Sequence, residues 1–332
     1  CESAVTFTLI EPALGRISGG LRYNSELSAA AGGRIERITA PGSWPEPTED
    51  DVARLRQLVA QCQSGESQRP VLIDGLIGCS LPTPLSGPVV MLQHSLAQGP
   101  SAQRREADCL QAASAVVTTS AFAAAEVARR YDITAEVARP GTHVRPVAQP
   151  GSPAHLICLG AMEDNKNQLF LAHVLQELRR RGATDWRCTF AGPITDTVYA
   201  EGVREALEGL TSVECVGELD EDGVDDLYRH ADLLLLPSKE ETLGMVVREA
   251  AAAAIPSFVT AGTGAQEALG AGRALALDVS AWADLLERWL SDEADRAELA
   301  ATAREVRESA VPEWNDTART VLAVLEGQVR VS

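Results

Sequence analysis

The chain has 332 residues, 45% of them hydrophobic, which is enough for two domains of ordinary size, each with its own core. Its formal net charge is −18, and residues 151–332 contribute −16 of it while residues 1–150 contribute −2. Such an acidic surface repels nucleic-acid phosphates and anionic lipid head groups. Nucleic acid is therefore excluded as an expected partner.

The distribution of apolar residues and cysteines bounds the compartment. The longest apolar runs, such as residues 233–236, have the length of a strand, so no integral membrane segment is expected. Seven scattered cysteines without a CxxC motif favour reduced thiols over a disulfide framework or a zinc site. No signal peptide precedes the first strand-like segment. We therefore predict a cytoplasmic protein, for which a homo-oligomer remains an open alternative.

Short β-branched runs alternate with amphipathic segments of helical length in the first half of the chain. The helix predicted at 48–63 begins after Thr48, which suits an N-cap above an acidic first turn. A second helix is predicted at 122–132. The predicted strands are near-continuous apolar runs, typical of parallel sheets covered on both faces, and they span residues 5–10, 70–75, 88–94 and 114–120.

Three prolines and a glycine interrupt this pattern at 145–154, after which it begins again. Five further strands, each followed by a helix-like segment, are predicted at 155–160, 187–192, 212–217, 232–237 and 256–260. The fold class is therefore α/β, with two doubly wound, Rossmann-like parallel-sheet domains. Ligands of such sheets bind beyond the carboxyl ends of the strands, so the expected site is a central cleft that the two domains face.

Two of the loops at strand ends have weak signals for anion binding. Gly19 and Gly20 open a helical pattern after the first strand, where backbone N–H groups can approach a phosphate, although the motif is not GxGxxG. Lys166, one of only two lysines in the chain, lies where a loop becomes a helix. Its ammonium could hold an anion together with the helix N-terminus, and a solvated surface lysine is the equally open alternative.

A stronger signal lies in the stretch PSKEETLGMVVREAAAAAIP, residues 237–256. Thr242, Leu243 and Gly244 are predicted to begin a helix, with Glu241 in the loop before it and Glu249 among small apolar residues inside it. Carboxylates accept hydrogen bonds from sugar hydroxyls, and the free N–H groups of a helix suit a diphosphate. This pattern fits a sugar nucleotide, while the alternative is that Glu241 is a first-turn acid that favours the helix dipole and Glu249 is a solvated helix residue.

The same stretch resembles the signature of family 4 retaining glycosyltransferases, which use nucleotide sugars and have the two-domain GT-B fold. The resemblance lies in P-S-x-x-E, a following glycine and a second glutamate after seven intervening residues, as at Glu241 and Glu249. It extends to SGGLRYNSELSAA, to the end of the first domain, and to Trp314 in the last helix. It implies domains at 1–148 (acceptor side) and 149–312 (nucleotide-sugar binding), with 313–332 as a helix returning toward the first domain.

The resemblance also implies roles for individual residues. Glu249 would accept from the ribose hydroxyls and Glu241 from hydroxyls of the donor sugar, while Lys166 would neutralise the leaving diphosphate. His94 would line the donor sugar, and Lys166, Glu241 and His94 form the expected catalytic set. The backbone that holds the diphosphate and sugar would come from Gly19, Gly20, Gly160, Thr242, Leu243 and Gly244.

One position departs from the family pattern. The family has an arginine directly after the glycine of LG, whereas this chain has Ala161 after Gly160. Half of the expected cationic clamp is therefore missing, and Arg22, Arg248 or an arginine of the first domain are candidate substitutes.

A metal is not expected. Asp220 and Asp222 spell D-x-D, yet they precede a helical stretch, where acidic residues cap a helix. The predicted function is thus a retaining glycosyltransferase that moves a sugar from a nucleoside-diphosphate sugar to a small, soluble acceptor, without a metal or other cofactor. A pseudo-glycosyltransferase and a non-catalytic sugar-nucleotide-binding subunit are the alternatives.

Overall fold

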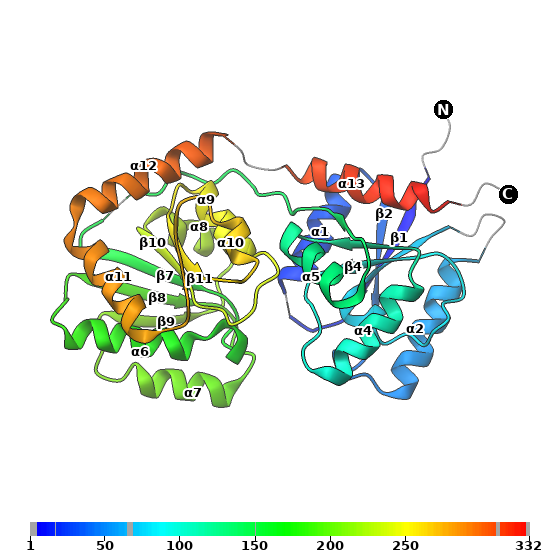
Figure 1. The fold of residues 1–332 in the computed structure, drawn as a ribbon, viewed down its shortest axis with the longest axis horizontal. Coiled ribbons are helices and arrows are strands. Elements are labelled where there is room, and N and C mark those ends of the chain that lie inside the picture. The colour runs from blue at the N-terminus through cyan, green and yellow to red at the C-terminus, as the bar shows by residue number, and fades with distance from the viewer. Residues whose placement is uncertain (1–4, 17, 65–68, 150, 310–312, 330–332) are drawn as a thin grey trace. The chain divides into compact units, whose positions relative to one another are not determined.

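The computed structural model describes residues 5–16, 18–64, 69–149, 151–309 and 313–329 (Figure 1). The chain divides into two compact units, the first formed by Cys1–Gly141 with Pro312–Ser332 and the second by Thr142–Val311. The first unit therefore includes the last helix of the chain. The division at 141/142 falls before the predicted boundary at 148/149, so the Pro-rich segment belongs with the second unit.

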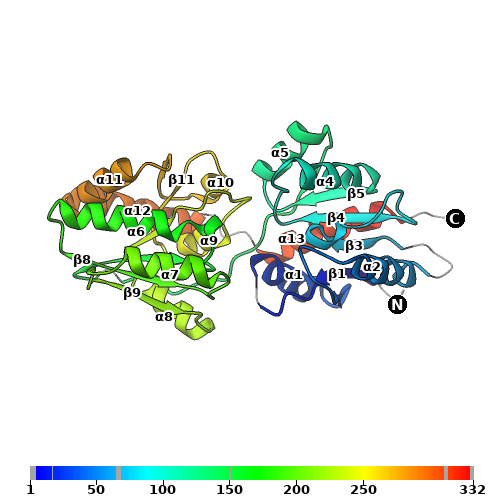
Figure 2. The ribbon, with the colours of Figure 1, turned by 90° about the horizontal axis from the view of Figure 1, so that it is seen from below.

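The first unit contains a six-stranded parallel sheet of order β2-β1-β3-β4-β5-β6. Figure 2 shows β5, β4, β3 and β1 in succession across it. The strands are β1 (Phe7–Pro12), β2 (Ile35–Ala40), β3 (Val71–Asp74), β4 (Val89–Gln93), β5 (Ala115–Thr118) and β6 (Glu136–Val137).

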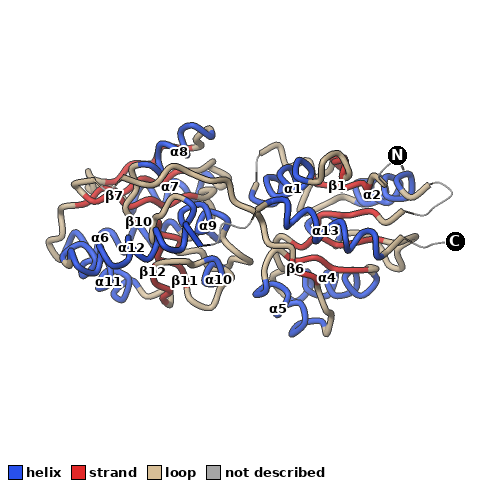
Figure 3. The backbone as a smooth tube through the Cα atoms, turned by 90° about the horizontal axis from the view of Figure 1, so that it is seen from above, coloured by secondary structure: helices blue, strands red, loops and turns tan. Residues whose placement is uncertain are grey.

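Helices cover both faces of this sheet. Leu55 and Val59 of α2, Cys109 and Leu110 of α4, and Val127 of α5 pack with strand residues in one buried cluster. On the other face α1 packs against α13, the last helix (Figures 1 and 3). The helices are α1 (Gly19–Ala30), α2 (Glu49–Cys62), α3 (Gly75–Gly78), α4 (Pro100–Ala112), α5 (Ala121–Tyr131) and α13 (Trp314–Gly327).

The second unit repeats this architecture with a parallel sheet of order β12-β11-β10-β7-β8-β9. Its strands are β7 (Ala154–Leu159), β8 (Trp186–Ala191), β9 (Val213–Gly217), β10 (Leu233–Leu236), β11 (Ser257–Thr260) and β12 (Gly272–Leu275). Its helical elements are η1 (Asp164–Lys166), α6 (Gln168–Arg180), α7 (Thr197–Ala206), α8 (Glu221–Arg229), α9 (Met245–Ala252), α10 (Ala265–Ala268), α11 (Val279–Ser291) and α12 (Glu293–Ser309).

The four leucines of β10 show why this sheet is buried on both faces. Side chains of a strand alternate between faces, so Leu233 and Leu235 pack with α6, α7 and α11. Leu234 and Leu236 point the other way and pack with α8, α9 and α10. Figure 1 shows α6 and α7 below the sheet and α9 and α10 above it. A continuous apolar run is thus the correct pattern for a central strand here.

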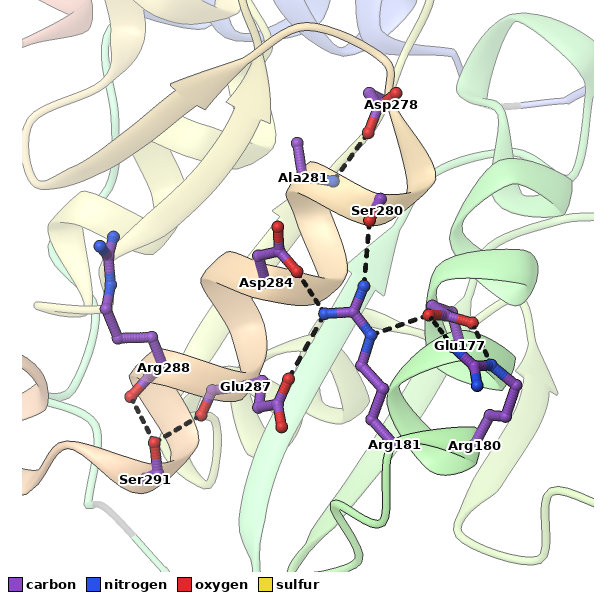
Figure 4. A network of polar contacts seen from close by, with 10 residues as sticks. All are labelled: Glu177, Arg180, Arg181, Asp278, Ser280, Ala281, Asp284, Glu287, Arg288 and Ser291. Carbon is purple, nitrogen blue, oxygen red and sulfur yellow. Dashed lines mark hydrogen bonds and ion pairs between the residues drawn. The ribbon is translucent and has the colours of Figure 1, made fainter.

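One side chain links two helices, α6 and α11, that cover the same face of the second sheet. Arg181, at the end of α6, donates to Glu177 on its own helix and to Ser280 of α11 at 3.0 Å, and it also pairs with Asp284 (Figure 4). The planar guanidinium has enough donors to serve several acceptors at once. This contact fixes α11 beside α6 on the solvent side of their shared apolar core.

Both sheets have a point at which the strand order reverses. In the first unit the chain moves from β1 outward to β2 and then returns to β3 on the other side of β1. In the second it moves from β7 through β8 to β9 and returns to β10 beside β7. Loops leave such neighbouring strands in opposite directions, so the carboxyl ends of β1 and β3, and of β7 and β10, are the expected ligand sites.

The sequence predictions for the elements are largely confirmed. All nine predicted strands are present, and Thr48 caps α2 in a capping box with Asp51. The strands β2, β6 and β12 were not predicted. β6 is two residues long, and β2 is exposed at its centre, so neither has the apolar run of a buried strand. The six cysteines within the described residues are free thiols, whereas Cys1 lies outside those residues.

No helix in the described ranges is both long and apolar enough to cross a membrane.

His155 is a titratable group inside the second sheet. Its side chain is 2% exposed; Nδ1 lies 3.0 Å from the His230 carbonyl oxygen and Nε2 lies 2.8 Å from Thr189 Oγ1. Burial lowers the pKa of His155 to about 4, and the nearby Arg187 acts in the same direction. The folded state therefore favours the neutral ring, which contributes stability above the ordinary pKa of about 6.5 and loses it as the pH falls toward 4.

We expect the free energy of unfolding of the wild type, measured by urea titration, to fall between pH 7 and pH 5. This fall should exceed that of His155→Gln by about 1–2 kcal/mol. His173→Gln is the matched control because His173 is exposed on α6. Parallel behaviour of wild type and His155→Gln over this range would contradict the assignment.

Candidate functional site

In the second unit, the loops that follow β7 and β10 are joined through Asn165. Its side-chain amide donates to the Glu240 carbonyl and accepts from the Glu240 N–H, both at 3.1 Å. The backbone carbonyl of Asn165 accepts from the Lys239 N–H at 2.8 Å. A further bond runs from Asn167 Nδ2 to the Pro237 carbonyl at 3.1 Å. The two loops therefore form one structural element, although 75 residues separate them in the chain.

This element brings two of the predicted site residues together. Lys166 Nζ lies 2.6 Å from Glu241 Oε1, and Ser238 Oγ donates to the same oxygen at 2.9 Å. The two charged side chains are 25% and 11% exposed, so Lys166 is not the solvated surface lysine of the alternative interpretation. Burial opposes the charge of Lys166, but the Glu241 carboxylate more than offsets it and raises the pKa of the ammonium. The pair is thus a preformed contact between a cation and an anion.

Glycines line this element. The stem of Lys166 runs beside Gly160, where an added Cβ would be 3.4 Å from Lys166 Cγ. Gly244 has a φ of 78°, in the left-handed region that residues with a side chain adopt only with strain. It is the N-cap of α9, so the helix begins at Met245. The prediction that the helix begins at Thr242 was wrong, because Thr242 and Leu243 continue the loop, whose Glu241 carbonyl accepts from the Gly264 N–H at 2.7 Å.

Glu249 lies just over one turn inside α9 and is 4% exposed, so it is not a solvated helix residue. Its Oε2 accepts from the Tyr228 hydroxyl at 3.1 Å and lies 3.5 Å from Arg145 Nη2. The guanidinium of Arg145 is 4.9 Å from the centre of the Tyr228 ring and also pairs with Asp225. A buried carboxylate is stable in the ionised form only with such partners.

Arg145 was missed by the sequence analysis. It lies in the Pro-rich segment that was interpreted as a boundary, and no periodicity marks a residue whose partners lie 80 and 104 positions away. The arginine expected after Gly160 is absent, and the methyl side chain of Ala161 supplies no charge. Arg145 does not replace it in that position, because its guanidinium contacts Asp225, Tyr228 and Glu249.

The remaining predicted residues lie in the first unit. Ser18 caps α1 by accepting from the Leu21 N–H at 3.2 Å, so Gly19 and Gly20 form the first turn. His94 follows β4, and an added Cβ at Gly20 would be 3.1 Å from its ring. Because the glycine allows the imidazole to approach the helix this closely, the structure brings Gly20 and His94 together at the carboxyl edge of the first sheet.

The D-x-D sequence has the structural role that was predicted for it. Asp220 is the N-cap of α8 and accepts from the Gly223 N–H at 2.9 Å, while Asp222 lies in the acidic first turn. Among the residues that the structure describes, no group of three or more His, Cys, Asp or Glu side chains is arranged to hold a metal ion.

Comparison with known proteins shows which proteins the chain resembles. Residues 153–292, all in the second unit, match the family model described as Glycosyl transferases group 1. The D-inositol 3-phosphate glycosyltransferase of Arthrobacter sp. (strain FB24) is 25% identical over 315 residues, which cover 77% of this chain and 72% of that protein.

Solved structures match nearly the whole chain. Sucrose-phosphate synthase from Thermosynechococcus elongatus is 16% identical with a TM-score of 0.78 and covers 97% of this chain and 98% of its own. Anabaena Alr3699/HepE in complex with UDP and glucose is 12% identical with a TM-score of 0.76 and covers 97% and 100%. The two six-stranded sheets thus have the GT-B fold. The second unit is thus similar to the group 1 glycosyl transferases, and both units have the fold of these solved structures.

The buried ion pair of Arg145 and Glu249 generates a prediction for stability. Arg145→Met leaves two carboxylates without their cation, and removing one partner of a buried pair destabilises a protein by roughly 3 kcal/mol. We expect Glu249→Gln to recover part of this loss in the double variant, as measured by urea unfolding of both single variants and the double variant.

Arg288→Met is the matched control, because Arg288 is on the exposed face of α11 (Figure 4). Strictly additive effects of the two single substitutions would show that the guanidinium and carboxylate do not stabilise each other.

Proposed function

We propose that this chain transfers a sugar from a nucleoside-diphosphate sugar to an acceptor, with retention at the anomeric carbon and without a divalent metal. The observation that supports the donor class best is the contact between Lys166 and Glu241 at the strand-order reversal between β7 and β10. It combines a cation suited to phosphate with a carboxylate suited to hydroxyl groups, where α/β sheets bind ligands. The neighbour HepE was solved with UDP and glucose, which have these same two chemistries.

In this proposal Lys166 stabilises the negative charge that develops on the leaving diphosphate, because a preformed cation needs little rearrangement during the reaction. The Gly244 region supplies backbone N–H groups and space for close approach. Glu241 accepts from hydroxyls of the transferred sugar. Glu249 serves the ribose, and its contacts with Arg145 and Tyr228 orient its carboxylate. The same proposal assigns His94 to the donor sugar.

For the acceptor, we propose a soluble small molecule that is rich in hydroxyl groups. The curated relative is named for D-inositol 3-phosphate, a compound of that kind. The net charge of −18 disfavours an anionic membrane surface as the place of the reaction. We also propose a cytoplasmic location and association into homo-oligomers.

Ala161 favours a second candidate, a subunit that binds sugar nucleotides without turning them over. The missing guanidinium would otherwise share with Lys166 the charge of the leaving group, and transition-state stabilisation depends on such groups more than binding does. The pseudo-glycosyltransferase alternative differs in the bond that is formed. Mass spectrometry of the product distinguishes the two reactions.

The first experiment is a thermal-shift screen against UDP, GDP, ADP and dTDP and their sugars in the presence of EDTA. We expect one nucleoside diphosphate to raise Tm, since a ligand present at 100 times its Kd stabilises the folded state by about 2.7 kcal/mol. Turnover of the matching sugar, also in EDTA, would support the transferase, and binding without turnover or donor hydrolysis would support the binding subunit. Binding that requires Mg²⁺ or Mn²⁺ would contradict the metal-independent proposal.

A second prediction separates the parts of the donor. Lys166→Ala should weaken a nucleoside diphosphate by roughly 1.5–3 kcal/mol and leave the nucleoside unchanged, because a charge-assisted hydrogen bond to phosphate is lost. Glu249→Gln should weaken both ligands, since both contain the ribose. Glu241→Gln should not weaken the nucleoside diphosphate, because it removes the anion that competes for Lys166, yet it should lower kcat/KM for the sugar donor.

Calorimetry measures the ligand affinities of the three variants, and a turnover assay measures kcat/KM. Lys239→Ala is the matched control, since this other lysine is in the same loop element but pairs with Asp164. Equal loss of nucleoside and nucleoside-diphosphate affinity in Lys166→Ala would rule out its phosphate role.

A further inference from the structure

A chain of three polar side chains ends at His94 in the first unit. Asn24 is on α1 and fully buried, and Asp74 ends β3, next to β1 at the point where the strand order reverses. Asn24 Nδ2 donates to Asp74 Oδ2 at 3.1 Å, and Asn24 Oδ1 lies 2.9 Å from His94 Nε2. Sequence analysis singled out His94 but neither of the other two residues.

The chemistry of these groups determines the position of the histidine proton. An ionised carboxylate only accepts hydrogen bonds, so the amide of Asn24 must turn its NH₂ group toward Asp74. Asp74 is itself oriented, because its Oδ1 accepts from the Leu76 N–H at 3.0 Å as the N-cap of α3. The amide oxygen of Asn24 then faces His94. Because this oxygen can only accept a hydrogen bond, Nε2 of His94 must carry the proton. Nδ1 is left as the acceptor nitrogen of the ring.

The ring is also restrained on its other sides. Tyr23 packs against it edge-on with 4.9 Å between ring centres, and the Tyr23 hydroxyl is anchored on the Ala138 carbonyl at 2.8 Å. Tyr23 is in turn supported by Trp314 of α13, with ring centres 5.4 Å apart. The ring also lies close to α1 at Gly20, where an added Cβ would be 3.1 Å from it.

Burial favours the neutral form of the His94 ring. Burial lowers the pKa of His94, and Asp74, at 3.6 Å from Nε2, acts in the opposite direction without overcoming burial. The other carboxyl group of the cluster is Glu11 of β1, which pairs with Arg37 at 3.1 Å; burial raises its pKa, and Asp74 contributes in the same direction.

We propose that Asn24 is a positioning residue that holds the imidazole of His94 with its proton on Nε2 and with Nδ1 as the acceptor nitrogen. Asp74 acts one step further away by fixing the orientation of the Asn24 amide. This inference deepens the proposed function, in which His94 lines the donor sugar: a neutral ring with a fixed proton has one acceptor nitrogen in one place, whereas an imidazolium has none.

The test compares Asn24→Asp and Asn24→Leu in the full chain. In Asn24→Asp a carboxylate replaces the amide at Nε2, so the pKa of His94 should rise by at least about one unit. NMR titration of protein labelled in its histidine rings measures this, with His94→Gln assigning the signal among five histidines. The acid limb of the kcat/KM profile for the sugar donor should move to higher pH by the same amount.

Asn24→Leu should lower kcat/KM by about tenfold or more through loss of the hydrogen bond that orients the ring. It should have no further effect in a His94→Gln background, because Asn24 acts only through the ring. Asn315→Leu, on an exposed part of α13 in the same unit, is the matched control.

A shift of less than about half a unit in the pKa of His94 in Asn24→Asp would overturn the proposal. So would a loss in Asn24→Leu that is equally large with and without His94. If no sugar donor is turned over, the proposed function fails, but the NMR titration still decides whether Asn24 controls the proton of His94.

Discussion

The pairing of β10 with β7 is the constraint on which the second unit depends. The register places Leu233 beside Leu156 and Leu234 beside Ile157, so the two strands end at the same edge of the sheet. Their following loops must then meet, and Asn165 joins them with hydrogen bonds to the backbone of Lys239 and Glu240. Backbone groups that would lack partners in an isolated loop are satisfied here by the other loop. Lys166 and Glu241 meet as a consequence of that arrangement.

The charged groups of this site are compensated before any ligand is present. Lys166 is paired with Glu241, and Arg145 with Glu249 and Asp225. A phosphate that approaches Lys166 therefore competes with Glu241, and the released carboxylate is free to accept from hydroxyls of the same ligand. A ligand that has only one of the two chemistries leaves one partner of the pair without a counter-charge, which is unfavourable in a partly buried site. In the proposed function, such an exchange favours sugar nucleotides over free phosphate.

The first unit orients its polar side chains through successive hydrogen bonds. Its carboxylate, amide and imidazole form a sequence of hydrogen bonds in which each group determines the orientation of the next. The aromatic side chains of Tyr23 and Trp314 restrain the same ring by packing alone. Because Trp314 comes from the last helix, the geometry near the first strand depends on residues at the other end of the chain. Gly141, where an added Cβ would clash with Trp314, allows this approach.

The sequence by itself determined what depends on local pattern. Continuous apolar runs predicted the central strands, because a strand buried on both faces has no polar side. Thr48 and Asp220 predicted helix starts, because a cap acts on amides two or three residues away. The spacing of Glu241 and Glu249 predicted a sugar-nucleotide site through its resemblance to a family.

Only the tertiary structure decided which residues meet. The partner of Lys166 is 75 positions away, the two partners of Asn24 lie 50 and 70 positions later in the chain, and Arg145 contacts Glu249 across 104 residues. Whether Glu249 was solvated or buried also depended on Tyr228 and Arg145, which come from other elements. Helix α9 began later than predicted because its first turn was replaced by a loop whose hydrogen bond is made to Gly264, on another segment. Contacts of this kind follow from strand order and packing, and no local pattern encodes them.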